Sequence, residues 1–475
     1  MRPLPAFGPA SPSGVALAAP RRAPVRLLSH EAYFRLLCFA LAGYALAGKG
    51  FAYVGVPPLF IGEIVLVLGV LVFLRARCWL ALSGNLPAVI LSMLIAWVLC
   101  RTVVFVPAYG VESLRDSVVV VYGIFALVVA SLLIEKPERI GWIIAVYAPF
   151  AWIYGIVAPV ILHFGTLFPG LPTWPGVGIP TIYVRLGEAA IHLTGVFVFV
   201  VLGFRRVSYV WCGFFLLSVT CIIPSRGAML SFLVPAVLAL LVSGRIRQVI
   251  LPLMAGLAIF AAAYGAGIEH ELEGGRVVGP QQIVRNFESL VGQSEASNLD
   301  GTKQWRLRWW DTIQNYTIRG PYFWSGKGFG VNLAMDDGVT GGQEANGPPL
   351  RSPHNVHYTI LARSGVPGLV LWLAAESAWF LMLARAFLIA RKRGDTRWAN
   401  ILLWIACYGL SIVIDATFDV AIEGPMVGIW HWCIFGLGIG AAMIYRAPPR
   451  AAPLSRDPLR DPFRLARSGA AIRPR

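Results

Sequence analysis

The sequence predicts an all-α polytopic membrane protein with about twelve transmembrane helices and one large external loop that contains short helices. Of its 475 residues, 57% are hydrophobic and only 13% are charged, and the mean hydropathy is +0.68. A soluble domain carries about twice that fraction of charged residues. Apolar runs of roughly 18–25 residues recur along the chain, and each is long enough to cross a bilayer as a helix.

The chain opens with a segment, 1–30, that is rich in Pro, Ala and Arg and contains no long apolar run. This composition predicts a disordered basic tail and not a cleavable signal peptide. Spans 1–9 are expected within 31–268, spans 10–12 within 356–446, and a second basic tail over 447–475. We place the spans at roughly 31–48, 58–75, 86–107, 116–134, 139–163, 186–204, 207–223, 226–243, 248–268, 366–390, 398–418 and 425–446.

Lys and Arg in the short loops predict the orientation of these spans. Loops on one side hold roughly 24 basic residues, including both tails, whereas loops on the other side hold about five, and basic loops stay in the cytoplasm. Both termini are therefore expected inside, and the segment 269–355 outside. The net charge of +16 follows this asymmetry, so it indicates contact with anionic membrane lipids and no nucleic-acid partner.

The expected external loop, 269–355, has helical periodicity over 280–292 and 302–317. In a helix Trp305 and Trp309 share one face, and such tryptophans either stack on sugar rings or sit at the lipid headgroups. The glycine-rich stretch 326–330 lacks the Lys-Ser/Thr ending of a phosphate loop, so we interpret it as a turn.

Ionisable residues of the predicted spans gather at their outer ends. A charge in a membrane is costly and is usually functional, although any single one of these residues could be an interfacial anchor. Together they predict a polar cavity that opens outward. They are Glu63, Arg101, Arg115, Asp116, Arg185, Glu188, Arg226, Asp415, Asp419 and Glu423.

The segment 351–368 ends the external loop and contains the candidate base, His354. Ser352 followed by Pro353 is typical of an N-cap with proline at the first helical position, which predicts His354 in the first turn of a helix. The helix dipole there favours a neutral imidazole, which can take a proton from an attacking hydroxyl. The alternative is that His354 and Asn355 only satisfy loop backbone groups.

Several arginines on the same side indicate a phosphate ligand, because the guanidinium fork donates two hydrogen bonds at once. Near the lipid boundary this favours a lipid diphosphate; the alternative is pairing with acids, for instance of Arg115. A metal site is not expected: His354 and His357 could share a helix face, but no third ligand stands at a telling spacing, and the seven cysteines lie in or beside apolar segments. We expect no cofactor.

Four short pieces resemble the O-antigen ligase and O-antigen polymerase (Wzy/WaaL-like) superfamily of bacterial envelope proteins. The order of the pieces and the pattern of the spans around them are similar to the family over roughly residues 190–440. The pieces are Ser225-Arg226-Gly227 at the start of a span, Arg306 through Trp310 in the external loop, the glycine turn Gly326 through Gly330, and Pro353-His354-Asn355 with Gly365 and Gly368 behind it.

The resemblance implies metal-independent, inverting glycan transfer at the outer face of the bacterial inner membrane, from undecaprenyl diphosphate to an acceptor hydroxyl. It implies that His354 is the base and that Arg226 and Arg306 hold the diphosphate; Arg115 is added from topology. Arg308 would replace Arg306 if the register were shifted by two. Asn355, His357, Asp419 and Glu423 are the expected supporting residues. The long basic tails are a departure that the resemblance does not explain.

Three kinds of enzyme share this donor chemistry and differ in the acceptor, and the sequence does not decide between them. A ligase transfers glycan to lipid A–core, a polymerase to another lipid-linked repeat unit, and an oligosaccharyltransferase to Ser or Thr of a protein. We favour a ligase, followed by a polymerase. A transporter or flippase would line a pathway near the bilayer midplane, and a passive scaffold would tolerate loss of His354.

Overall fold

The computed structural model describes residues 29–168, 170–267, 270–272, 276–279, 297–339 and 350–447. The described chain is helical apart from two small antiparallel hairpins, β1 (Gly55–Val56) with β2 (Leu59–Phe60) and β3 (His270–Leu272) with β4 (Arg276–Val278). This confirms the helical class. Most of both predicted tails and the predicted helix 280–292 lie outside the described residues.

Each predicted span coincides with a helix or a helix pair. These are α1 (His30–Ala47), α3 (Ile61–Ala76), α5 (Leu86–Val103), α7 (Val111–Val121) with α8 (Ile124–Glu135), α9 (Arg139–Leu162), α11 (Leu186–Val201), α12 (Tyr209–Thr220), α13 (Arg226–Ser243), α14 (Ile246–Gly265), α18 (Val356–Lys392), α19 (Thr396–Phe418) and α20 (Pro425–Arg446). Within the described ranges, six helices are long and apolar enough to cross a membrane, or seven if the bent pair α7 and α8 forms one span. A multi-pass membrane protein is thus supported, and the number twelve stays a prediction.

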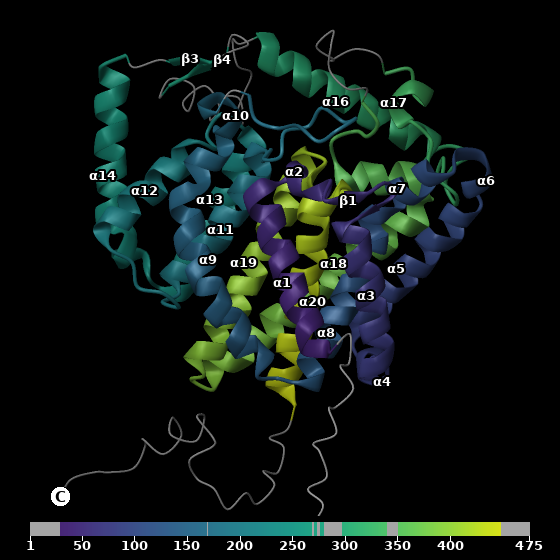
Figure 1. The fold of residues 1–475 in the computed structure, drawn as a ribbon, viewed down its shortest axis with the longest axis horizontal. Helices are drawn as coiled ribbons and strands as arrows, with labels where there is room; N and C mark the ends of the chain where they lie inside the picture. The colour runs from purple at the N-terminus through teal and green to yellow at the C-terminus, as the bar shows by residue number, and fades with distance from the viewer. Residues whose placement is uncertain are drawn as a thin grey trace, which may run out of the picture.

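The remaining elements are short apart from α16, and most of them gather at one end of the bundle (Figure 1). At that end lie α2 (Lys49–Ala52), α10 (Phe164–Leu167), α16 (Ser297–Tyr316) and α17 (Leu333–Asp336), with both hairpins. The predicted helix 302–317 is confirmed as part of α16. The other short pieces are α4 (Trp79–Ser83), α6 (Val106–Tyr109) and the 3₁₀ turn η1 (Ala421–Glu423).

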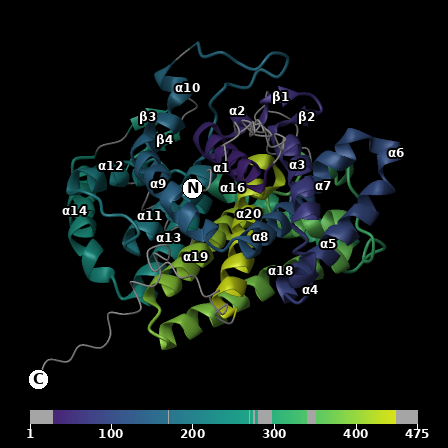
Figure 2. The same ribbon diagram turned by 60° about the horizontal axis from the view of Figure 1, so that its bottom comes forward.

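Helix α20 runs through the middle of the bundle, and α18 and α19 pack against it (Figures 1 and 2). Nearly nine-tenths of the apolar stretch of α20 is buried inside the protein. Indole N–H groups tie these helices to their neighbours: Trp404 donates to Gly195 O, Trp379 to Phe435 O and Trp432 to Val119 O, at 2.8–3.1 Å. Such bonds matter in a bilayer, where no water satisfies a free donor.

Helix α18 begins at Val356, ten residues before the predicted start of its span at 366, and it bends at Gly365, where φ is 73°. Pro367 follows and offers no N–H, so carbonyls before the bend lose their helical partners. The glycine turn supplies replacements: Lys327 N donates to Ala362 O at 2.7 Å and Gly328 N to Arg363 O at 3.0 Å. The predicted turn is therefore confirmed.

Glycine is required at this contact. A Cβ on Gly326 would lie 2.4 Å from the Arg363 carbonyl carbon, and Gly326, Gly328 and Gly330 all have positive φ. The turn thereby fixes the segment between α16 and α18 to the bent part of α18, and this connection positions the site described below.

The sidedness of the bundle can be tested with single cysteines in a variant that lacks the native ones. Arg319→Cys, on the exposed turn after α16, is expected to react with an impermeant maleimide in spheroplasts, because Arg319 lies in the predicted external loop. Arg393→Cys, exposed at the end of α18, is expected to react only after lysis. The reverse pattern would overturn the predicted orientation.

Candidate active site

The segment 351–355 approaches α18 in an extended path and turns sharply at His354. The N-cap of α18 is Asn355, whose Oδ1 accepts from His357 N at 2.9 Å and from Tyr358 N at 3.3 Å. The prediction of an N-cap at Ser352 was therefore wrong, and His354 precedes the helix. Pro353 permits a helix start, but the amide side chain of Asn355 reaches two free N–H groups and fixes the start there.

His354 has a left-handed backbone, with φ of 52°. Its Nδ1 lies 3.3 Å from Oδ1 of Asp419. Burial alone would raise the pKa of Asp419, but the hydrogen bond from His354 and the positive charge of Arg185 hold it below its ordinary value. Because an ionised carboxylate only accepts, a neutral imidazole in this position donates from Nδ1 and carries its lone pair on Nε2. A general base could use this arrangement.

Asp419 follows directly after α19, where Oδ1 also accepts from Val420 N at 2.8 Å. Both side chains of the pair are partly accessible, 24% for His354 and 33% for Asp419, so a hydroxyl can reach the imidazole. The ring of Trp305 on α16 stands edge-on to the imidazole, with centroids 6.4 Å apart.

Two arginines from distant parts of the chain meet beside this pair. Arg306 Nη1 donates to the Phe418 carbonyl at 2.7 Å. Burial lowers the pKa of Arg306, the charge of Asp419 opposes that shift, and the charge of Arg226 adds to it. The lowered pKa does not cost Arg306 its charge at neutral pH, because arginine keeps its proton in proteins.

Arg226 is the first residue of α13, and Ser225 caps this helix by accepting from Ala228 N at 3.4 Å. A Cβ on the next residue, Gly227, would lie 2.9 Å from Cβ of Phe418. Glycine therefore lets the start of α13 pack directly against the end of α19, next to Asp419 and the carbonyl bound by Arg306. The structure thus brings His354, Asp419, Arg306 and Arg226 to one place.

Arg115 and Arg308 do not join this group. Arg115 contacts Glu112 at 2.6 Å, which is the acidic pairing considered as its alternative role. Arg308 is exposed on α16 and its Nε lies 3.4 Å from the carbonyl of Gln304 on its own helix. The register of α16 therefore places Arg306, and not Arg308, against the end of α19.

The other supporting candidates have structural partners. His357 Nδ1 accepts from Trp372 Nε1 at 3.1 Å, and its Nε2 lies 3.4 Å from Thr417 Oγ1. Glu423 is half-buried, and desolvation raises its pKa although Thr359 and Ser352 donate hydrogen bonds to it. Both residues brace the walls of the site.

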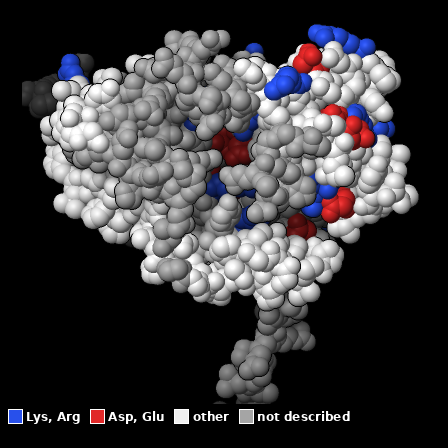
Figure 3. Space-filling model, turned by 90° about the horizontal axis from the view of Figure 1, so that it is seen from above, with Lys and Arg blue, Asp and Glu red and all other residues white. Residues whose placement is uncertain are grey.

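Further charges extend the site toward α11. Arg185 N donates to Glu188 at 3.3 Å, and a Cβ on Gly187 would lie 2.4 Å from the carboxylate of Asp415. Seen from the end that carries α16, the charged side chains surround a hollow in the middle of this face (Figure 3). Acidic and basic side chains thus gather on this face; that the predicted residues face outward and line a substrate cavity stays a prediction.

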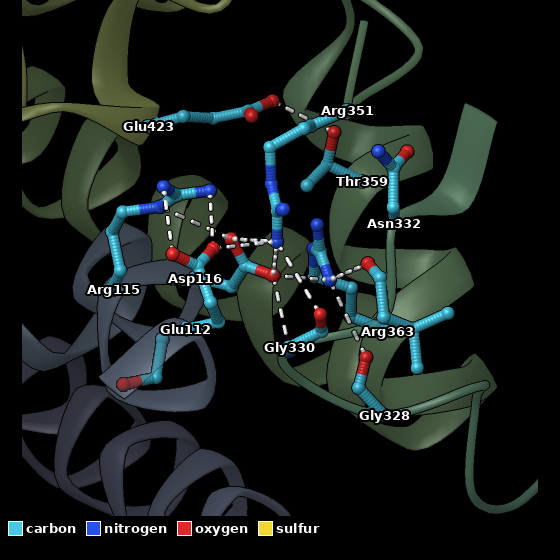
Figure 4. Close-up of polar contacts among 12 residues, drawn as sticks. Glu112, Arg115, Asp116, Gly328, Gly330, Asn332, Arg351, Thr359, Arg363 and Glu423 are labelled. Atoms are coloured by element: carbon cyan, nitrogen blue, oxygen red, sulfur yellow. Dashed lines mark hydrogen bonds and ion pairs between the residues drawn. The ribbon is translucent and has the colours of Figure 1, made fainter. Parts of the chain in front are cut away.

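Sequence reasoning missed the residues that hold the segment before His354. Arg351 and Arg363 both contact Asp116 (Figure 4). Trp310 Nε1 donates to the Pro353 carbonyl at 3.0 Å, and its ring stacks on Tyr358. An arginine inside an apolar helix was the signal that could have found Arg363. Trp310 was named only as the last residue of one resembling piece, and Arg351 has no comparable signal, because its partner Asp116 is distant in sequence.

Within the described part of the chain, no group of three or more His, Cys, Asp or Glu residues could hold a metal ion. Three further groups of the kind that bind metals lie apart or are already paired: His270 lies in β3, and Asp336 and Asp337 form ion pairs with Lys327 at 2.6 and 2.5 Å.

A family model described as O-antigen ligase matches residues 224–373. All four pieces of the sequence resemblance lie within this segment, so the resemblance is confirmed. No curated protein matches the chain. One matching chain belongs to a solved structure described as "Structural coordination of polymerization and crosslinking by a peptidoglycan synthase complex"; it is 17% identical, with a TM-score of 0.40 over 76% of this chain and 96% of that chain. That similarity is too low to support a conclusion.

Proposed function

Because this membrane protein carries an O-antigen ligase segment over residues 224–373, we propose that it transfers a glycan from undecaprenyl diphosphate to an acceptor hydroxyl at the outer face of the bacterial inner membrane. The transfer would serve the assembly of a surface polysaccharide. The observation that carries this proposal is the His354–Asp419 pair beside Arg306 and Arg226.

Each group has a defined part in a single displacement. Nε2 of His354 takes the proton of the acceptor hydroxyl while the oxygen attacks the anomeric carbon. The bond from that carbon to the diphosphate oxygen breaks, and the diphosphate leaves with the bonding electrons. Arg226 and Arg306 stabilise the charge that develops on it. Asp419 keeps the proton on Nδ1 and stabilises the imidazolium that forms. One displacement inverts the anomeric configuration.

Asp419→Asn tests the orienting carboxylate. The amide keeps the size of the side chain but loses its charge, so it stabilises the imidazolium less and can present a donor to Nδ1. We expect the transfer rate to fall about 100-fold, in the range of general-base effects, with an unchanged KM for the donor. The rate is measured in membrane vesicles from a deletion strain that received the purified variant. A wild-type rate would remove Asp419 from the mechanism.

The acceptor separates the candidate enzymes. A strain without a ligase is expected to accumulate long lipid-linked chains, and a strain without a polymerase single lipid-linked repeats. We favour the ligase. Sizing the lipid-linked glycans of a deletion strain decides between them, and a protein acceptor would appear as unglycosylated protein. If the protein is instead a flippase, its deletion would leave the lipid-linked glycan on the cytoplasmic side, where enzymes added to spheroplasts cannot reach it.

A further inference from the structure

Asp116 on α7 is the centre of a buried network outside the four residues of the proposed chemistry (Figure 4). Its Oδ2 lies 2.9 Å from Nη1 of Arg363 and 3.2 Å from Nη2 of Arg351, and it accepts from Gly330 N at 3.0 Å. The side chains of Asp116 and Arg363 are only 8% and 3% exposed. Two cations and one backbone N–H therefore converge on one carboxylate oxygen.

The same network binds the glycine turn from its other side. Arg363 Nη1 donates to Val331 O at 3.1 Å and lies 3.5 Å from Gly328 O. Asp116 thus connects three separate pieces of chain: α7, the turn at 328–331, and the bent part of α18. Separating any one piece would leave a buried charge of Asp116 or Arg363 without part of its hydrogen bonds, which is costly. The three pieces are therefore held together as one unit.

Arg351 extends this unit to the catalytic segment, since it stands three residues before His354. Its Nη2 contacts Asp116 and lies 3.3 Å from the Gly330 carbonyl. Beyond it, Trp310 holds the Pro353 carbonyl and Asn355 caps α18. A left-handed conformation at a residue other than glycine persists only where its surroundings determine it, and these contacts do so for His354.

We propose that Asp116 is a positioning residue: through Arg351 and the glycine turn it sets where His354 stands relative to Asp419 and the diphosphate-binding arginines. This inference rests on the proposed function for its effect on rate, but its structural part can be tested alone. Asp116 does not touch the substrate. Its loss slows the chemical step because the base is displaced, and it leaves donor binding unchanged.

Three variants of the full-length protein in lipid nanodiscs test the contacts from Asp116 to His354 one by one. Asp116→Asn removes the negative charge at the centre of the network and is expected to loosen both 328–331 and 351–355. Arg351→Gln cuts only the link to the catalytic segment and affects a residue that is 29% exposed, so the protein is expected to fold. Asp311→Asn is the matched control: it also removes the charge of an aspartate that faces an arginine, but Asp311 and its neighbour Arg319 are both exposed and lie outside this network.

Amide hydrogen exchange, measured without substrate, gives the structural readout. Exchange is expected to rise in 328–331 and 351–355 for Asp116→Asn, only in 351–355 for Arg351→Gln, and in neither for Asp311→Asn. In reconstituted deletion-strain membranes, kcat is expected to fall about 100-fold for Asp116→Asn and about 10-fold for Arg351→Gln, at an unchanged KM for the endogenous donor. The control is expected to change kcat less than about threefold, as an exposed ion pair would.

The outcomes distinguish the two proposals. Unchanged exchange at 351–355 in both Asp116→Asn and Arg351→Gln overturns the positioning role. Faster exchange with a wild-type kcat also overturns it. If wild type transfers no glycan while exchange changes as expected, the proposed function fails and the structural link survives. An Asp116→Asn protein that does not fold leaves the decision to Arg351→Gln.

Discussion

His354→Ala is expected to abolish surface polysaccharide in a deletion strain that wild type restores. The imidazole stands at the left-handed turn before α18, with Nδ1 3.3 Å from Asp419 Oδ1. In the neutral ring that donates to Asp419, Nε2 carries the lone pair that takes the proton. Removing a general base costs about 10²–10⁴-fold in rate, which leaves too little transfer to build a polymer. Lipid-linked glycan is expected to accumulate at the same time.

The control for this variant is His30→Ala, with the level of each protein in the membrane measured. His30 pairs with Glu135 at 2.7 Å, at the end of the bundle opposite α16, so its loss is expected to leave polysaccharide at the wild-type level. Full restoration by His354→Ala would mean that the base is another residue or that the protein does not catalyse the transfer.

Arg306→Lys and Arg226→Lys are each expected to reduce transfer by about 10–100-fold although the charge is kept. A lysine cannot donate the paired hydrogen bonds of a guanidinium fork to a diphosphate. One charged hydrogen bond contributes about 1.5–3 kcal/mol, which corresponds to this range. Because the diphosphate is present before and during the reaction, we expect a higher KM for the donor together with a lower kcat.

Arg308→Lys is the matched control for Arg306→Lys. It lies on the same helix two residues further on, and it is exposed, near a carbonyl of its own helix. Transfer by this variant is expected to be unchanged. Equal losses in Arg306→Lys and Arg308→Lys would indicate a general effect of charge along α16 and would contradict specific binding by Arg306.

The helices of this protein could be located from sequence because apolar runs are long and basic loops are short. Each predicted span lies on a helix, and the external helix at 302–317 is part of α16. The start of α18 was misplaced because two capping signals compete within four residues: Ser352 precedes a proline, but Asn355 makes the bonds. Sequence shows both signals and not which side chain reaches the free N–H groups.

The candidate site was partly predictable. His354, Arg226 and Arg306 carry sequence signals, and the structure brings them together with Asp419. Arg115 was expected on the same grounds, yet it pairs with Glu112, because an acidic residue three positions away lies on the same helix face. Asp116 was recognised only as a charge at a helix end. Its three partners come from the glycine turn, the segment before His354 and α18, and only the tertiary structure connects them.

Release of undecaprenyl diphosphate by the purified protein tests the central claim most directly. The donor is the lipid-linked glycan extracted from the deletion strain, and the acceptor is supplied as that strain's outer-membrane lipid, or as further donor for a polymerase. Wild type in nanodiscs is expected to release undecaprenyl diphosphate only when an acceptor is present, and His354→Ala at least about 100-fold more slowly. No release by wild type with either acceptor, or equal release by His354→Ala, would contradict base-catalysed glycan transfer by this chain.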